Sequence, residues 1–165
     1  MLPAMPIDDL PTADAVEALT ACCGSGRWVR EVMARRPFGS REALRAASDR
    51  AFATLEKNDW LEAFAHHPRI GERHANIPVS DMAAQWSSGE QSAANSDPAA
   101  LNELARANAQ YDARFGFIFI VCATGLGTAD IQEKLRARLA NSAEEELSIA
   151  AREQRAITTL RLEKL

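Results

Sequence analysis

Apolar residues recur at helical spacing along most of this 165-residue chain, and this periodicity limits the fold more than any other feature. Ser40 is a candidate N-cap, and Leu44 and Ala51 would share the buried face of the helix that follows. Comparable apolar stripes follow four more candidate helix starts, at Asn58, Asp97–Pro98, Thr128 and Ser142, the last with Glu145 in a capping box. The sequence therefore predicts an all-α fold, a compact multi-helix bundle.

One apolar run, residues 115–123, departs from the helical pattern because it is rich in aromatic and β-branched side chains. Its propensity is that of a buried strand, yet the sequence holds no second run of this kind with which it could pair. An isolated strand would leave its backbone polar groups unsatisfied. We therefore expect a buried extended or helical segment, closed by Gly125 and Gly127.

Composition limits the class of protein further. The length fits one domain over residues 1–165, and the 47% hydrophobic and 25% charged fractions indicate neither disorder nor a fibrous repeat. A net charge of −4 argues against nonspecific binding of nucleic acid, which needs a basic face. Because no apolar run approaches the length of a bilayer-spanning helix, we expect no membrane partner.

The cysteines and the first residues suggest a compartment. Cys22, Cys23 and Cys122 are an odd number, two of them adjacent, which favours reduced thiols over a disulfide framework. Residues 1–6 have neither a charged region nor a long apolar core, so we expect no secretory signal. The sequence thus predicts a cytoplasmic protein. Its histidines show no zinc-ligand spacing with these cysteines, and we expect no metal.

His67 is the first candidate for chemistry. Pro68 pushes the residue before it out of the α region, so a helix should end near His66 and leave His67 at its exit. A histidine held there is suited to proton transfer near neutral pH. The alternative is a surface histidine favoured by the helix dipole. We expect His66, which would face elsewhere, to be structural.

Two further groups of residues bear polar side chains suited to a small ligand. Ser87, Glu90 and Gln91 place a carboxylate beside an amide, although Ser87 and Glu90 also fit a capping box. Arg161 lies seven residues after Gln154 and shares the apolar face of the last helix. A buried guanidinium needs a protein acid such as Glu90 or a substrate carboxylate, unless the side chain reaches the surface near the C-terminus.

Taken together, several ordered motifs resemble those of the 2-oxo-4-hydroxy-4-carboxy-5-ureidoimidazoline (OHCU) decarboxylase family. These are Trp28 with residues 36–38, residues 67–71, Ser87 with Glu90 and Gln91, residues 115–123, and residues 157–162. The resemblance spans nearly the whole chain. It implies an all-helical and often dimeric enzyme that converts OHCU to S-allantoin and CO2 during urate degradation, without a cofactor.

The resemblance also implies roles for residues at matching positions. His67 corresponds to the catalytic proton donor and Glu90 to its acidic partner, whose charge would raise the pKa of the imidazole. The substrate-binding positions would be Pro68, Ser87, Gln91, Ile120, Val121, Cys122, Ala123, Thr124 and Arg161. A ureidoimidazoline would be the small-molecule partner, and we expect a homodimer. The alternatives are a noncatalytic helical module that binds a small anion or a partner helix, and another ureide or purine lyase.

Overall fold

A computed structural model describes residues 5–68 and 98–165, and these residues form eight α-helices and no strand. The all-α prediction is therefore confirmed. The helices are α1 (Pro6–Asp9), α2 (Thr12–Cys22), α3 (Gly26–Met33), α4 (Arg41–Phe52), α5 (Lys57–Ala65), α7 (Pro98–Phe115), α8 (Thr128–Arg138) and α9 (Ala143–Leu162). None of these helices is both long enough and apolar enough to span a bilayer.

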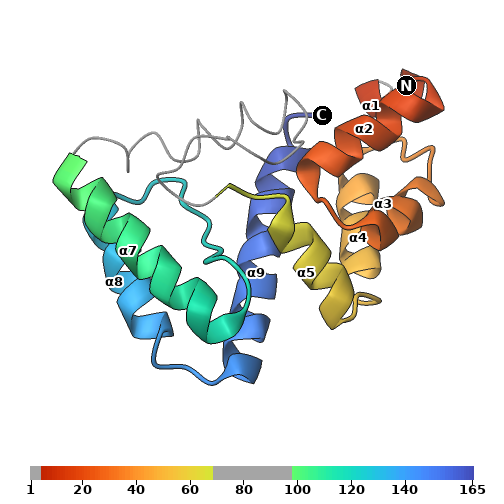
Figure 1. Ribbon diagram of the computed structural model, residues 1–165. Coiled ribbons are helices and arrows are strands. Elements are labelled where there is room, and N and C mark those ends of the chain that lie inside the picture. Colours follow the sequence, from red (N-terminus) through yellow and green to blue (C-terminus); the bar gives the residue numbers. More distant parts are fainter. Residues whose placement is uncertain (1–4, 69–97) are drawn as a thin grey trace.

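The long C-terminal helix α9 runs through the middle of the arrangement (Figure 1). Helices α2, α4 and α5 pack against it on one side, whereas α7 and α8 pair with each other on the other side. A small apolar cluster joins Phe64 of α5, Ile120 of the connection after α7, and Ile157 of α9. This cluster brings the end of α5 and residues around 120 onto the same helix.

The helix starts show which capping signals were correct. The Ser40 hydroxyl accepts a hydrogen bond from the Ala43 amide at 3.1 Å, as the sequence predicted for α4. Ser142 and Glu145 form the predicted reciprocal capping box, with bonds of 3.2 and 2.9 Å. The starts of α7 at Pro98 and of α8 at Thr128 also agree with the prediction, although Asp97 lies outside the described residues.

The predicted cap at Asn58 is wrong. Helix α5 begins at Lys57 and its N-cap is Glu56, so Asn58 lies within the first turn. The reason is a side chain three residues into the helix: the Asp59 carboxylate accepts a hydrogen bond from the Glu56 amide at 2.8 Å. That bond satisfies a donor at the helix start without any contribution from Asn58.

Phe115 ends α7, and residues 116–123 of the apolar run are neither helix nor strand and pair with no described strand. Side chains replace the missing neighbour: Arg138 Nη1 donates to the Ile120 carbonyl at 2.5 Å, and the Cys122 amide donates to Glu153 Oε2 at 2.9 Å. At the end of the run, Gly125 has a φ of 80°, a conformation that favours glycine. Two charged side chains, Arg138 and Glu153, therefore bind backbone groups that have no neighbouring strand.

Arg138 belongs to a buried ionic cluster. Its Nε donates to Glu146 at 2.5 Å, and Glu146 is fully buried. The same carboxylate accepts from the Tyr111 hydroxyl, and burial together with this carboxylate raises the pKa of the tyrosine. The guanidinium also lies over the Phe119 ring, 4.4 Å from its centroid. An ion pair with its hydrogen bonds satisfied is thus placed directly behind residues 119 and 120.

Candidate functional site

His67 lies one residue beyond the C-cap of α5, as its position before Pro68 predicted. The helix ends at Ala65, His66 is the C-cap, and the His67 amide still donates to the Phe64 carbonyl at 3.1 Å. His67 is only 9% exposed, and Pro68 is buried as well. The interpretation of His67 as a surface histidine is therefore wrong: the turn directs it into the protein.

A chain of hydrogen bonds connects His67 to α9 and α2. His67 Nε2 and Gln154 Oε1 are 2.6 Å apart, and both side chains are buried. Gln154 Nε2 donates to the Thr158 hydroxyl at 3.0 Å, and that hydroxyl donates to the Cys22 carbonyl at 3.2 Å. This chain, which we call the neutral network, consists of His67, Gln154, Thr158 and the Cys22 carbonyl.

These surroundings lower the pKa of His67 to about 3. The largest cause is burial, which disfavours the imidazolium, and the positive charge of Arg161 acts in the same direction. The hydrogen bond to Gln154 opposes them only in part. The direction is opposite to the rise that we expected from Glu90. His67 is therefore neutral at physiological pH.

Arg161 points inward from the last turn of α9. It is 4% exposed, and its Nη1 donates to the Ala21 carbonyl at 3.1 Å. The alternative in which this side chain reaches the surface is therefore wrong. Since its charge influences His67, a buried cation and a neutral imidazole lie in the same region.

The predicted backbone contact segment lies next to the same part of α9. Ile120, Val121 and Ala123 are buried, Cys122 is half-buried and Thr124 is exposed. Glu153, which binds the Cys122 amide, is adjacent in sequence to Gln154, which binds His67. Two successive residues of α9, with Cα atoms about 3.8 Å apart, therefore hold the histidine and the backbone at Cys122.

Three predicted site residues, Ser87, Glu90 and Gln91, lie outside the described residues. The other predicted site residues lie in one region of the structure: His67, Pro68, Arg161 and the segment around Ile120.

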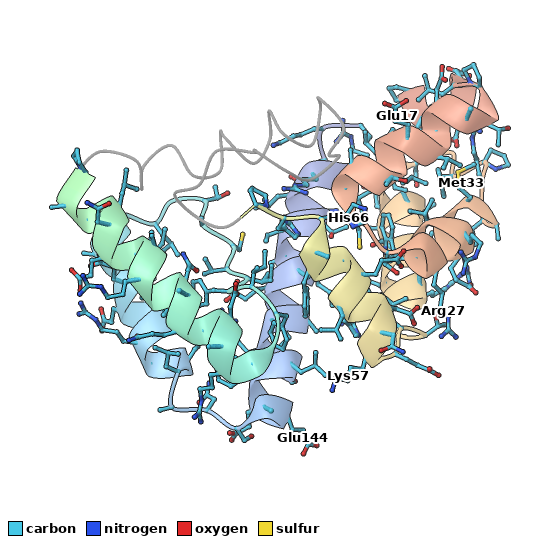
Figure 2. The ribbon with its side chains drawn as sticks, in the orientation of Figure 1. Glu17, Arg27, Met33, Lys57, His66 and Glu144 are labelled. Carbon is cyan, nitrogen blue, oxygen red and sulfur yellow. The ribbon has the colours of Figure 1, made fainter. Side chains whose placement is uncertain are left out.

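His66 is structural, as predicted. Its Nδ1 donates to the Glu62 carbonyl at 2.9 Å, and Figure 2 shows it at the end of α5. Gly24 makes room for this ring, because a Cβ at position 24 would lie 2.2 Å from His66 Cγ. The two adjacent histidines therefore have separate environments.

The described part of the chain offers little other catalytic chemistry. Burial raises the pKa of the Cys22 and Cys23 thiols to about 12, so neither is a ready nucleophile. Within residues 5–68 and 98–165, no three His, Cys, Asp or Glu side chains are grouped as metal ligands.

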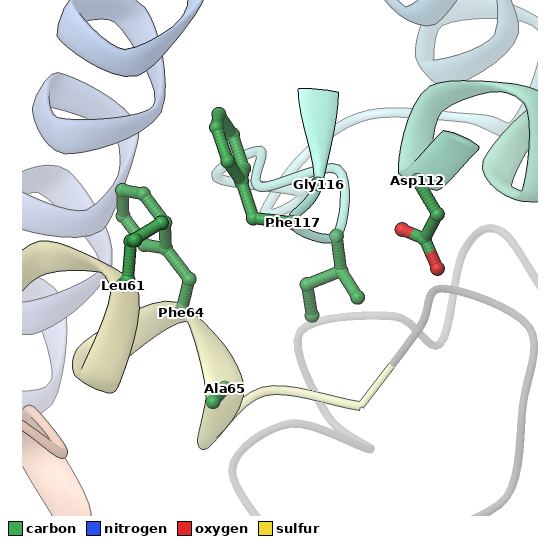
Figure 3. Close-up of a pocket in the computed structure, with 7 residues that line it drawn as sticks. Leu61, Phe64, Ala65, Asp112, Gly116 and Phe117 are labelled. Carbon is green, nitrogen blue, oxygen red and sulfur yellow. The ribbon is translucent and has the colours of Figure 1, made fainter. Parts of the chain in front are cut away.

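A cavity of about 330 Å³ opens between the ends of α5 and α7. Figure 3 shows its lining, which is apolar apart from the Asp112 carboxylate: Leu61, Phe64, Ala65, Asp112, Gly116, Phe117 and Ile118. His67 and Arg161 are not among these residues. The buried imidazole and the buried guanidinium therefore lie outside the described lining of this cavity.

The sequence interpretation missed Gln154 and Thr158 as partners of the histidine. A signal for them exists, because Gln154, Thr158 and Arg161 follow one another at helical spacing on the apolar face of α9. Polar side chains on such a face need buried partners. Arg138 and Glu153 were also missed, because each binds a backbone group that is distant in sequence.

Comparison with known proteins places this arrangement in a family. A sequence model of the OHCU decarboxylase family matches residues 8–163. The OHCU decarboxylase of Halalkalicoccus jeotgali is 29% identical over 166 residues, which cover 96% of this chain and 90% of that protein. The uric acid degradation bifunctional protein of Arabidopsis thaliana is 41% identical over 145 residues, which cover 87% of this chain. That match spans only 45% of the Arabidopsis protein.

A solved structure agrees with the sequence comparisons. The crystal structure of an OHCU decarboxylase in the presence of (S)-allantoin superposes with a TM-score of 0.73 at 38% identity. The superposition covers 90% of this chain and 96% of the other. Since the family model, a full-length relative and a solved structure all agree with the motifs in the sequence, the chain belongs to the OHCU decarboxylase family.

Proposed function

We propose that this chain catalyses the decarboxylation of OHCU to S-allantoin and CO2 in urate degradation, with His67 as the residue that moves the proton. Family membership supports the reaction and makes the chain a carboxy-lyase. The observation that carries the role of His67 is its environment: a buried, neutral imidazole held by one ring nitrogen in the region of a buried arginine.

The substrate itself can accept the electrons that decarboxylation releases. When CO2 leaves, the electron pair of the broken carbon–carbon bond moves toward the adjacent C=N group and forms a C=C bond, and the ring nitrogen takes up a proton from water. The intermediate is an enol. The hydroxyl proton then leaves the oxygen, the neighbouring carbon gains a proton, and the ring amide carbonyl of allantoin results.

His67 is suited to both halves of this last step. Neutral at physiological pH, it accepts the hydroxyl proton as a general base, and the resulting imidazolium delivers a proton to the carbon. Its low pKa makes the imidazolium a strong acid, so the proton is released readily. Delivery from a fixed position reaches one face of the carbon and yields one enantiomer. The catalytic role is thus base first and donor second.

The remaining predicted residues would bind and orient the ring. Arg161 supplies a buried cation that favours the substrate carboxylate or its carbonyl oxygens. Ser87, Glu90 and Gln91 keep their proposed roles, with Glu90 as the acidic partner, and Pro68 lines the site. The backbone of residues 120–124 would contact the substrate and exclude water, since Arg138 and Glu153 fix its position.

The first test compares the two adjacent histidines. His67→Asn and His66→Asn variants receive freshly generated OHCU, and circular dichroism follows the appearance of optically active product. We expect His67→Asn to lose about 10²- to 10⁴-fold in rate, the usual contribution of general acid–base catalysis, and His66→Asn to retain activity. One-handed product formed by His67→Asn at the wild-type rate would show that His67 is not the residue that moves the proton.

Arg161 has a separate test. If it binds substrate, Arg161→Gln raises KM or lowers kcat/KM. If it is structural, the variant loses stability while KM for OHCU is preserved. Since Nη1 satisfies the Ala21 carbonyl, we expect some loss of stability in addition to the kinetic effect.

We further propose that residues 1–165 act as one domain, as a homodimer in the cytoplasm and without a cofactor. The family model supports the single unit, because it extends from residue 8 to residue 163. Light scattering of the purified chain measures the oligomeric state directly.

A further inference from the structure

The neutral network determines which nitrogen of His67 carries the proton. The Cys22 carbonyl can only accept, so the single proton of the Thr158 hydroxyl points to it. The Thr158 oxygen must then accept from Gln154, which places the amide nitrogen of Gln154 on that side. If the amide were rotated, the Gln154 carbonyl oxygen would face the Thr158 oxygen, and neither atom could donate to the other.

This orientation leaves the Gln154 carbonyl oxygen facing the imidazole at 2.6 Å. An amide oxygen cannot donate, so His67 Nε2 must be the donor. A neutral imidazole has one N–H group, and Nδ1 therefore carries the lone pair. Among the described residues none forms a hydrogen bond with Nδ1, and the ring keeps 9% exposure.

We propose that Gln154 is a positioning residue: together with Thr158 it holds His67 as the Nε2–H tautomer, so that Nδ1 is the nitrogen that exchanges the proton with the substrate. The second half rests on the proposed decarboxylation, whereas the tautomer is a property of the substrate-free protein. Gln154 acts only through His67, and Thr158 acts only through Gln154.

The tautomer is measured directly by NMR on protein labelled with nitrogen-15 in its histidine rings. Long-range correlations between ring nitrogens and carbon-bound protons distinguish the two neutral forms, and His66→Asn and His74→Asn variants assign the signals. Above the ordinary histidine pKa, we expect His67 to show Nε2–H. His66 is an internal reference, because its Nδ1 donates to the Glu62 carbonyl and it should show the opposite tautomer.

Substitutions then test the positioning role. Gln154→Met keeps the length of the side chain but removes the acceptor, so both tautomers of His67 should become populated. We expect kcat to fall about 10- to 100-fold, as for other residues that orient a functional histidine. KM should stay within about threefold, because Gln154 does not touch the substrate.

A second set of variants keeps the test valid if Gln154→Met folds poorly. Thr158→Val preserves shape and removes the hydroxyl, which frees the Gln154 amide to rotate, so the Nδ1–H form should appear and kcat should fall. Thr158→Ser restores the hydroxyl and should restore both the tautomer and kcat. Thr159→Val is the matched control, since the Thr159 hydroxyl donates to the Arg155 carbonyl outside the neutral network.

Two results would overturn the proposal. One is a wild-type spectrum in which His67 carries its proton on Nδ1. The other is wild-type kcat together with an unchanged tautomer in folded Thr158→Val or Gln154→Met. Failure of the proposed function is distinguishable from these results. If His67→Asn retained full activity, the catalytic role assigned to His67 would be wrong. The spectrum of the substrate-free protein would still determine the tautomer.

Discussion

The two buried polar networks on α9 differ in charge. Near the start of the helix, Glu146 forms an ion pair with Arg138 and accepts a hydrogen bond from Tyr111 in the buried ionic cluster. Two to three turns later, Gln154 and Thr158 hold His67 through neutral groups alone. Both networks lie behind the proposed site, the first supporting the backbone at Ile120 and the second supporting the imidazole.

The difference follows from what each network supports. A peptide carbonyl does not titrate, so an ion pair can hold it strongly without altering its chemistry. An imidazole does titrate, and a buried carboxylate bonded to Nε2 would raise its pKa and favour the imidazolium. The Gln154 amide orients the ring, and its hydrogen bond only partly opposes the lowering of the His67 pKa by burial. The neutral network therefore fixes His67 in position and leaves it uncharged at physiological pH.

The largest expected effect follows from removing one charge of the buried ionic cluster. Arg138→Met or Glu146→Leu alone leaves a buried charge without its partner, which typically lowers the free energy of unfolding by about 3–5 kcal/mol. The double variant removes both charges and should be more stable than either single variant. Urea unfolding followed by circular dichroism measures all three.

Arg136 gives a matched control for Arg138. It lies on the same helix and pairs with Glu103, but both side chains are more than half exposed. Arg136→Met should therefore change the free energy of unfolding by about 0–1 kcal/mol. Equal losses for Arg136→Met and Arg138→Met would contradict the assignment of a special role to the buried pair.

A smaller effect is expected from pH in the neutral network. The pKa of His67 is about 3 in the folded protein against an ordinary 6.5, so the unfolded chain binds the additional proton between these values. Stability should therefore fall as pH decreases below 6.5 and be independent of this group above it. Between pH 6.5 and 5 the loss attributable to His67 is about 2 kcal/mol.

The measurement is the difference in pH dependence between wild type and His67→Asn. Urea unfolding from pH 5 to 7.5 should give a shallower decline for the variant, because it lacks the titrating group, whereas His66→Asn should follow the wild-type slope. Parallel curves for wild type and His67→Asn would mean that the imidazole is not buried in its neutral form. Carboxylates contribute equally to each protein and cancel in the comparison.

Local signals in the sequence predicted much of the fold. Ser142 with Glu145 and Ser40 were recognised because a cap and its partner lie within three residues of each other. The cap of α5 was misplaced because Asn58 is the stronger capping type, while the actual N-cap, Glu56, depends on Asp59. Capping propensity ranks residue types, but the hydrogen bond between the Glu56 amide and Asp59 determines where α5 begins.

The site was predicted less completely than the fold. His67 could be found because Pro68 ends a helix, a local effect. Its partner Gln154 is 87 residues away, and Arg138 acts on a carbonyl 18 residues away, so neither contact is readable from spacing. The resemblance to a family supplied roles for the substrate-contacting groups but none for Gln154 or Arg138, which lie behind them.

The smallest expected effect separates stability from site geometry. Ser142→Ala removes the cap of α9, which should lower the free energy of unfolding by about 1 kcal/mol. Both networks extend from this helix, yet neither includes Ser142. Because the contacts of Glu146 and Gln154 remain, kcat for OHCU should be unchanged. Ser148→Ala, at an exposed position within the same helix, is the control and should be neutral or slightly stabilising. If Ser142→Ala lowered kcat as much as Gln154→Met, general loosening of α9 would explain the kinetics of both variants, and the neutral network would lose its special role.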